Sequence, residues 1–219
     1  MEIAKKKDFV ELKFTGYSNG SIFDSNVDED LKKIEPEAKP RETIIVVGER
    51  MVVQGLDNAL EGKEIGKDYE VSIPAKEGFG ERRKDLIKTI PLKIFTAKKI
   101  NPYPGLVLAM DENLARVITI SGARVVTDFN NPLAGKDLIY KFKIVRKVTD
   151  DSEKAKTFFI QTLKFVPDFE VRGGDIVLKG IKVFEKIVEA LKEKFKEIVG
   201  KELKFEEKKE EKKNSDKKD

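Results

Sequence analysis

The chain has 219 residues, of which 38% are charged, yet its net charge is only +4. It contains neither cysteine nor histidine, which excludes disulfides, thiolate chemistry, histidine-ligated metal sites and a Ser-His-Asp triad. Because charges of both signs are mixed along the sequence, without a basic stripe interleaved with aromatic residues, nucleic acid is a poor candidate partner.

The sequence carries no targeting pattern. Residues 1–8 are basic and lead directly into a strand pattern, without the apolar stretch of a signal peptide. No apolar run is long enough to cross a membrane. We therefore expect a cytoplasmic protein that makes no membrane contact. The abundance of Lys and Glu is typical of thermophilic proteins and hints at an archaeal type of source.

The first half of the chain has the alternation of an antiparallel sheet. Strands are expected at residues 9–16, 21–24, 44–47 and 69–73. Residues 26–39 change from acidic to basic, contain Pro36 and are followed by Pro40, which predicts a surface loop with one helical turn. Apolar residues four apart in 56–60 predict a short helix. It must lie against the sheet, because isolated helices of that length are marginal in water.

The sheet is completed only much later in the chain. Leu138, Tyr140 and Phe142 fall on one face of a strand predicted over residues 138–148. Between the two halves lies a segment that we call the insert, residues 83–130. It is expected to contain a short helix at 91–95 and strands at 106–110, 116–121 and 124–128. Its core must be small, because it has only about fifty residues.

The last part of the chain is expected to be a separate α+β module. Residues 158–166 are a mostly apolar run that predicts a strand, and residues 203–205 predict another. Apolar residues at spacings of three and four over 181–199 predict an amphipathic helix whose leftover apolar surface favours self-association. In residues 206–219, twelve of fourteen side chains are charged, which predicts a disordered tail.

Four motifs carry a family resemblance. The chain reads Phe-Asp-Ser at 23–25, Val-Val-Gln-Gly-Leu at 52–56, Gly-Phe-Gly at 78–80 and Asn-Pro-Leu-Ala-Gly at 131–135. In this order, over residues 1–150, they resemble the FKBP-type peptidyl-prolyl isomerases. The late Leu-Ala-Gly return is similar to the SlyD-like branch, in which a small domain is inserted into the flap near the active site.

The resemblance implies an α+β fold. An FKBP-like antiparallel half-barrel around a short helix would carry an inserted small β-rich flap domain and a C-terminal α+β module. The expected boundaries are 1–82 and 131–150 for the two parts of the FKBP domain, 83–130 for the insert, 151–205 for the C-terminal module and 206–219 for the tail.

The resemblance also assigns roles to residues at the expected site. It implies catalytic roles for Asp24, Phe79 and Tyr140, with no metal and no cofactor. The expected substrate-binding residues are Phe14, Phe23, Val52, Val53 and Leu56 in the pocket, with Phe95 and Leu108 on the insert. For each apolar residue, simple core packing is the competing interpretation. Phe14, Leu56 and Phe79 replace tyrosine or tryptophan of other members, which predicts slower catalysis at this pocket.

The chemistry implied by the resemblance needs only an apolar hollow. An Xaa-Pro bond rotates over a barrier of about 18–20 kcal/mol, and removing water from the amide weakens its double-bond character. We therefore expect a peptidyl-prolyl isomerase and folding chaperone whose insert captures unfolded or proline-containing clients. A holdase chaperone with a vestigial pocket is the alternative, and a purely structural adaptor is disfavoured because the motif order serves no evident packing need.

Overall fold

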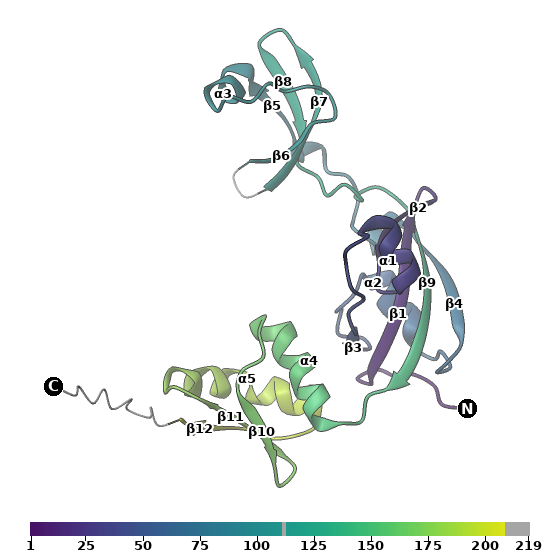
Figure 1. Ribbon diagram of the computed structural model, residues 1–219, viewed down its shortest axis with the longest axis vertical. Coiled ribbons are helices and arrows are strands. Elements are labelled where there is room, and N and C mark those ends of the chain that lie inside the picture. The colour runs from purple at the N-terminus through teal and green to yellow at the C-terminus, as the bar shows by residue number, and fades with distance from the viewer. Residues whose placement is uncertain (111–112, 209–219) are drawn as a thin grey trace, which may run out of the picture.

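The computed structural model describes residues 1–110 and 113–208. A body that contains the sheet strands of residues 9–73 and 138–147 carries the insert at one end and the C-terminal module at the other (Figure 1). The strands fall into three sheets, one in each part. This α+β arrangement confirms the predicted fold class.

The body is an antiparallel sheet in the order β2-β1-β9-β4, and β3 pairs with the start of β1. The short helix α2 supplies buried leucines to the core formed with this sheet. Residues 26–39, expected to be a loop with one helical turn, contain a seven-residue helix, α1. The body elements are β1 (Phe9–Ser18), β2 (Ser21–Ser25), α1 (Asp28–Ile34), β3 (Ile44–Val46), α2 (Gln54–Leu60), β4 (Asp68–Ile73), the 3-10 turn η1 (Ala75–Glu77) and β9 (Leu138–Lys147).

Strand β9 is the central strand of the body. Its residues alternate so that Leu138, Tyr140, Phe142 and Ile144 are buried, while the intervening residues remain at least partly exposed. The register places Tyr140 opposite Gly16 of β1 and Val71 of β4. Because directly paired residues share one face of a sheet, the apolar side chains of three strands converge on one face together with those of α2.

The insert has its own antiparallel sheet, in the order β5-β8-β7-β6. Strand β5 was not predicted, and it includes Pro91, which was expected as the first residue of the helix; the helix instead begins at Leu92. The small core contains Phe95, Met110, Ala115, Val117 and Val125. The insert elements are the 3-10 turn η2 (Lys84–Leu86), β5 (Ile87–Pro91), α3 (Leu92–Ala97), β6 (Val107–Met110), β7 (Asn113–Ser121) and β8 (Arg124–Asp128).

Two linker segments join the insert to the body, and they are held to each other by polar contacts. The Asn130 side chain accepts a hydrogen bond from the Arg83 N–H at 2.8 Å and donates to the Arg83 carbonyl at 2.9 Å. Arg82 forms an ion pair with Asp128 at 2.5 Å. We call these four residues the clasp. It fixes where the two linkers meet without burying an apolar core.

The predicted strand at 158–166 is wrong, because helix α4 (Asp151–Leu163) occupies most of this segment. The Asp150 side chain accepts a hydrogen bond from the Glu153 N–H at 2.8 Å, which caps the helix. Ala155, Phe158 and Phe159 are buried, whereas Ile160 is exposed, which is a helical pattern. An apolar run of this length does not separate strand from helix by itself.

The rest of the C-terminal module follows the prediction more closely. The amphipathic helix is confirmed as α5 (Val183–Val199), and Gly200 ends it in a left-handed conformation. Strand β10 (Phe169–Arg172) was not predicted, and it pairs with β11 (Asp175–Gly180). Strand β12 (Leu203–Glu207) extends the module two residues into the segment predicted as tail. The predicted disorder of 209–219 lies outside the described residues.

The C-terminal module is joined to the body by an apolar core and an ion-pair network. Phe9, Val46 and Val148 of the body belong to the same buried cluster as Phe158 and Phe159 of α4. The joint is therefore built differently from the clasp at the insert.

No helix in the described part of the chain combines the length and apolar character that a bilayer crossing requires.

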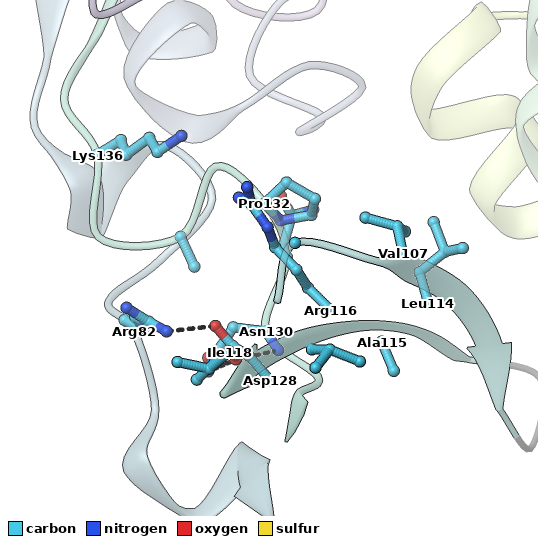
Figure 2. Close-up of a pocket in the computed structure, with 14 residues that line it drawn as sticks. Arg82, Val107, Leu114, Ala115, Arg116, Ile118, Asp128, Asn130, Pro132 and Lys136 are labelled. Carbon is cyan, nitrogen blue, oxygen red and sulfur yellow. Dashed lines mark hydrogen bonds and ion pairs between the residues drawn. The ribbon is translucent and has the colours of Figure 1, made fainter. Parts of the chain in front are cut away.

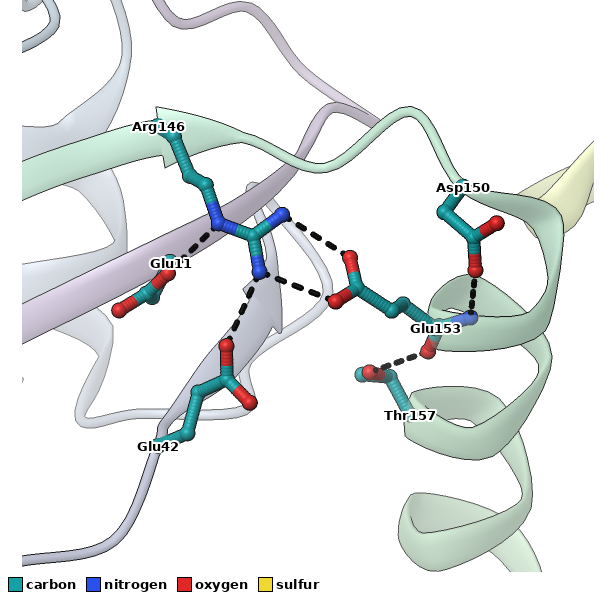
Figure 3. A network of polar contacts seen from close by, with 6 residues as sticks. All are labelled: Glu11, Glu42, Arg146, Asp150, Glu153 and Thr157. Atoms are coloured by element: carbon teal, nitrogen blue, oxygen red, sulfur yellow. Dashed lines mark hydrogen bonds and ion pairs between the residues drawn. The ribbon is translucent and has the colours of Figure 1, made fainter.

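Arg146 of β9 lies at the centre of the ion-pair network (Figure 3). Its guanidinium donates to Glu11 at 2.7 Å, to Glu42 at 2.9 Å and to both carboxylate oxygens of Glu153 at 2.9 and 3.1 Å. The hydrogen bond from Arg146 lowers the pKa of the Glu153 carboxyl. Since Glu11 belongs to β1 and Glu153 to α4, one side chain connects the body sheet to the first helix of the module.

Candidate functional site

Four aromatic rings meet on the inner face of the body, and we call them the aromatic cluster. The Tyr140 ring lies 5.9 Å from Phe14 and 5.7 Å from Phe23, and Phe23 lies 5.9 Å from Phe79. Phe23 meets both Tyr140 and Phe79 nearly edge-on, which is a favourable arrangement for aromatic pairs. The members come from β1, β2, β9 and the loop after η1, so the cluster brings together four of the predicted site residues.

Gly16 is the residue that allows these rings to approach. It pairs with Tyr140 across β1 and β9, and a Cβ atom at this position would lie 2.6 Å from Cζ of Phe23 and 3.0 Å from Cε1 of Tyr140. The first distance is too short for two non-bonded carbon atoms, and the second is tighter than most such contacts. The sequence analysis missed Gly16, although a glycine inside an alternating strand is a known sign of close approach.

The segment before α2 brings Val52 and Val53 to the same apolar cluster as Tyr140. Both valines are half-buried, as are Phe14, Phe23 and Phe79. Leu56 is only 1% exposed and belongs to the fully buried core beneath. The prediction that Leu56 contacts substrate is therefore corrected, because its side chain presents no surface to a ligand in this conformation.

Asp57 holds the segment before α2 in place, and its role was not predicted from the sequence. Its carboxylate, on a residue only 4% exposed, accepts hydrogen bonds from the N–H groups of Gly48 at 2.9 Å and Arg50 at 2.8 Å. Both residues have positive φ angles, which makes a tight turn directly before Val52. An acidic residue inside a short, mostly apolar helix was the only sequence signal for this role.

Asp24 and Tyr140 are the titratable groups beside the aromatic cluster. Asp24 as a whole is exposed, but partial burial of its carboxyl raises its pKa above 3.8, the Ser25 N–H lowers it, and the charge of Glu35 raises it. Burial also raises the pKa of Tyr140, and the Asp24 charge adds to this shift. Tyr140 is therefore a neutral phenol at physiological pH. No hydrogen bond among the described residues involves its hydroxyl, which leaves that hydroxyl available as a donor.

The insert residues predicted to contact substrate lie elsewhere. Phe95 is 1% exposed and fills the core of the insert, and Leu108 is half-buried against the same core. Phe95 thus cannot contact a client in this conformation, and the prediction for it is wrong. Phe95 is buried because a module of about fifty residues has few other large apolar residues with which to form a core. The large apolar side chains that the insert does expose are Ile94, Tyr103, Val107, Leu114 and Ile118.

A cavity of about 410 Å³ lies where the insert meets the linkers (Figure 2). Its walls come from β6 and β7 of the insert, from the clasp and from the linker around Pro132. Exposed Val107, Leu114 and Ile118 line it. Both linkers leave the body beside the aromatic cluster. Gly80 of the first linker follows Phe79 directly, and its carbonyl accepts a hydrogen bond from the N–H of Gly135 in the second linker at 2.8 Å.

Comparison with known proteins assigns the family. The family model described as FKBP-type peptidyl-prolyl cis-trans isomerase matches residues 1–95, and the model described as FKBP26, IF domain, matches residues 88–133. The FKBP-type isomerase SlyD of Treponema pallidum is 31% identical over 123 residues, which cover 52% of this chain and 67% of the relative. The chain belongs to the FKBP-type peptidyl-prolyl cis-trans isomerases.

Other relatives of this isomerase support the same assignment. The short-type peptidyl-prolyl cis-trans isomerase of Methanocaldococcus jannaschii is 29% identical over 147 residues, covering 66% of this chain and 94% of the relative. SlyD of Helicobacter pylori is 25% identical over 156 residues, covering 69% and 78%. Among the described residues of the isomerase, no group of three or more acidic side chains is placed to hold a metal ion.

Replacing Gly16 by alanine tests whether isomerisation depends on the packing of the aromatic cluster. In Gly16→Ala, the new methyl group displaces Phe23 and Tyr140, so we expect kcat/KM for a proline tetrapeptide to fall about tenfold while the unfolding free energy falls by about 1–3 kcal/mol. Gly180→Ala is the matched control, since its Cβ would lie 2.9 Å from Phe184 in the C-terminal module. Equal losses of kcat/KM in both variants would contradict the assignment of the aromatic cluster as the site of isomerisation.

Proposed function

We propose that this isomerase turns Xaa-Pro bonds of unfolded polypeptides at the aromatic cluster while the insert holds the client chain nearby. The observation that carries the proposal is the convergence of Phe14, Phe23, Phe79 and Tyr140 on one face of the body, where Gly80, next to Phe79, is hydrogen-bonded to Gly135 of the second linker. Rotation about the amide transfers no atom and needs no nucleophile. Side chains that exclude water and a few fixed polar groups are sufficient.

The proposed roles follow from the surroundings of each residue. Phe23, Val52 and Val53 contact the proline ring and keep water from the amide, together with Phe14. Tyr140 supplies a neutral hydroxyl that is free to donate to a substrate carbonyl, which Phe79 cannot do. Asp24 places a negative charge beside the rotating amide. Phe79 contributes an apolar wall.

The charge of Asp24 is testable through the pH dependence of the reaction. Since its pKa is raised, the carboxylate takes up a proton at a higher pH than an ordinary aspartate, and kcat/KM for a tetrapeptide should begin to fall there on acidification. In Asp24→Asn we expect kcat/KM to be about three- to tenfold lower and flat over the same pH range. Glu35→Gln removes a charge that raises this pKa, so its profile should shift to lower pH. An unchanged profile in Asp24→Asn would refute the role.

The insert raises the effective concentration of prolines at the cluster in this proposal. A weak site and a chain-binding site on one molecule make the second encounter intramolecular. Three exposed apolar side chains, Val107, Leu114 and Ile118, line the cavity next to the linkers. Large exposed apolar side chains gathered at one concave place favour binding of a partner.

Deletion of residues 84–129 separates the two activities. Arg83 and Asn130 are hydrogen-bonded to each other, so the cut ends lie side by side and a short glycine link can close them. We expect tetrapeptide isomerisation to stay within about twofold, while catalysed refolding of a proline-limited protein slows on the order of 100-fold. Equal losses on both substrates would contradict capture by the insert. If even the full-length protein leaves the tetrapeptide rate unchanged, the alternative, a holdase with a vestigial pocket, is favoured.

We further propose that the C-terminal module forms a homodimer. Its exposed large apolar side chains are Ile160, Phe165, Val166, Val171, Ile181 and Val183. The Phe165 ring contacts Phe184 edge-on at 6.3 Å, which brings the end of α4 to the start of α5. Sedimentation at micromolar concentration should show a dimer that Phe165→Glu dissociates and that Ile139→Glu, at an exposed site on the body, leaves intact. A strict monomer would remove this proposal.

A further inference from the structure

The cavity at the base of the insert combines an apolar surface with positive charge. Leu114, Arg116 and Ile118 of β7 are all exposed and line the cavity, although the pairing of β7 with β8 shifts register beside Ile118. The intervening Ala115 and Val117 are buried in the core of the insert. Val107 of β6 is the register partner of Arg116. Arg116 therefore lies in the middle of an apolar surface.

Of the three cations among the described residues that line the cavity, two form no ion pair. Arg82 is paired with Asp128, the only carboxylate among the described residues that line the cavity. Arg116 and Lys136 form no ion pair with any residue in 1–110 or 113–208, although they line the same cavity (Figure 2). Arg116 belongs to the insert and Lys136 to the linker that leads into β9. The cavity thus carries an excess of positive charge from both of its walls.

We infer that the cavity selects extended client segments in which an acidic residue has an apolar residue two positions away on each side. The acidic side chain pairs with Arg116 and Lys136, and the apolar side chains two residues away contact Leu114, Ile118 and Val107. This selectivity rests on the proposed function, in which the insert holds clients, and adds the chemical class of the segment that it holds.

The lining residues favour a polypeptide over a nucleic acid. Single-stranded nucleic acids bind where aromatic side chains stack on bases along a basic groove. No aromatic residue is among the described residues that line this cavity. Instead, aliphatic side chains flank the unpaired arginine, and alternating apolar and charged groups match the two-residue period of an extended peptide.

The test compares three labelled peptides of about ten residues that are identical except at one position. The central five residues are Leu-Ser-Xaa-Ser-Leu, in which Xaa is Asp, Asn or Lys, so that the variable side chain and both leucines share one face of an extended chain. Binding to the full-length protein is measured by fluorescence anisotropy at low and at high salt. We expect the Asp peptide to bind about two- to fivefold tighter than the Asn peptide, as for other exposed ion pairs, and the Lys peptide to bind weakest. The differences should shrink at high salt because mobile ions screen exposed charges.

Charge reversal identifies the residues responsible. Arg116→Glu and Lys136→Glu should each weaken or invert the preference for the Asp peptide. Arg124→Glu is the matched control, because Arg124 is an exposed arginine of the same insert sheet that does not line the cavity. The control should keep the order of the wild-type protein.

The outcomes separate this inference from the proposed function. Equal affinity for all three peptides, or an order that Arg116→Glu and Lys136→Glu both leave unchanged, overturns the selectivity while leaving client capture intact. If none of the peptides binds, client capture fails together with the selectivity. A single-stranded oligonucleotide that binds as tightly as the Asp peptide also overturns the inference, because the site would then recognise polyanions in general.

Discussion

The register of β9 is the constraint on which the rest of the molecule depends. This strand pairs with β1 on one side and with β4 on the other. Because side chains alternate between the two faces of a strand, a slip of one residue would turn Tyr140 outward and bring Ile139 or Lys141 inward. The aromatic cluster would then lose its central ring. At its ends, β9 also leads to the insert through Lys136 and to the C-terminal module through Arg146.

The two attachments of the body differ in their physical nature. The C-terminal module shares a buried apolar cluster with the body, so separating the two would expose the rings of Phe158 and Phe159 to water. The insert is attached by the clasp, whose hydrogen bonds between Arg83 and Asn130 are exposed to solvent and therefore individually weak. A rigid joint on one side and a polar one on the other suit a protein that presents a client to a fixed site.

Much of the architecture could be predicted because the patterns were long and periodic. The alternation in 138–148 and the spacing of apolar residues in 181–199 each indicated the correct element. The segment 158–166 failed because a short apolar run is compatible with both element types, and the cap formed by Asp150 and Glu153 was overlooked. That cap was visible in the sequence as an acidic residue three positions before a glutamate.

The site was only partly predictable for a different reason. Family motifs indicated Phe23, Phe79 and Tyr140, but the buried positions of Phe95 and Leu56 depend on tertiary packing that no local pattern contains. The same holds for Asp57, whose two hydrogen bonds reach back to a turn that precedes its own helix. In β7, the alternation of Ala115 and Val117 with Leu114 and Ile118 needed the sheet before its inward face could be known.

The central claim is that the aromatic cluster itself receives the proline. Proton NMR of the full-length protein with a proline tetrapeptide tests it most directly, through nuclear Overhauser effects between the proline ring and protein side chains. The account predicts contacts from the proline ring to Phe23, Phe79 and Tyr140, together with faster exchange between the cis and trans signals. Contacts confined to the insert, with no change in that exchange rate, would contradict it.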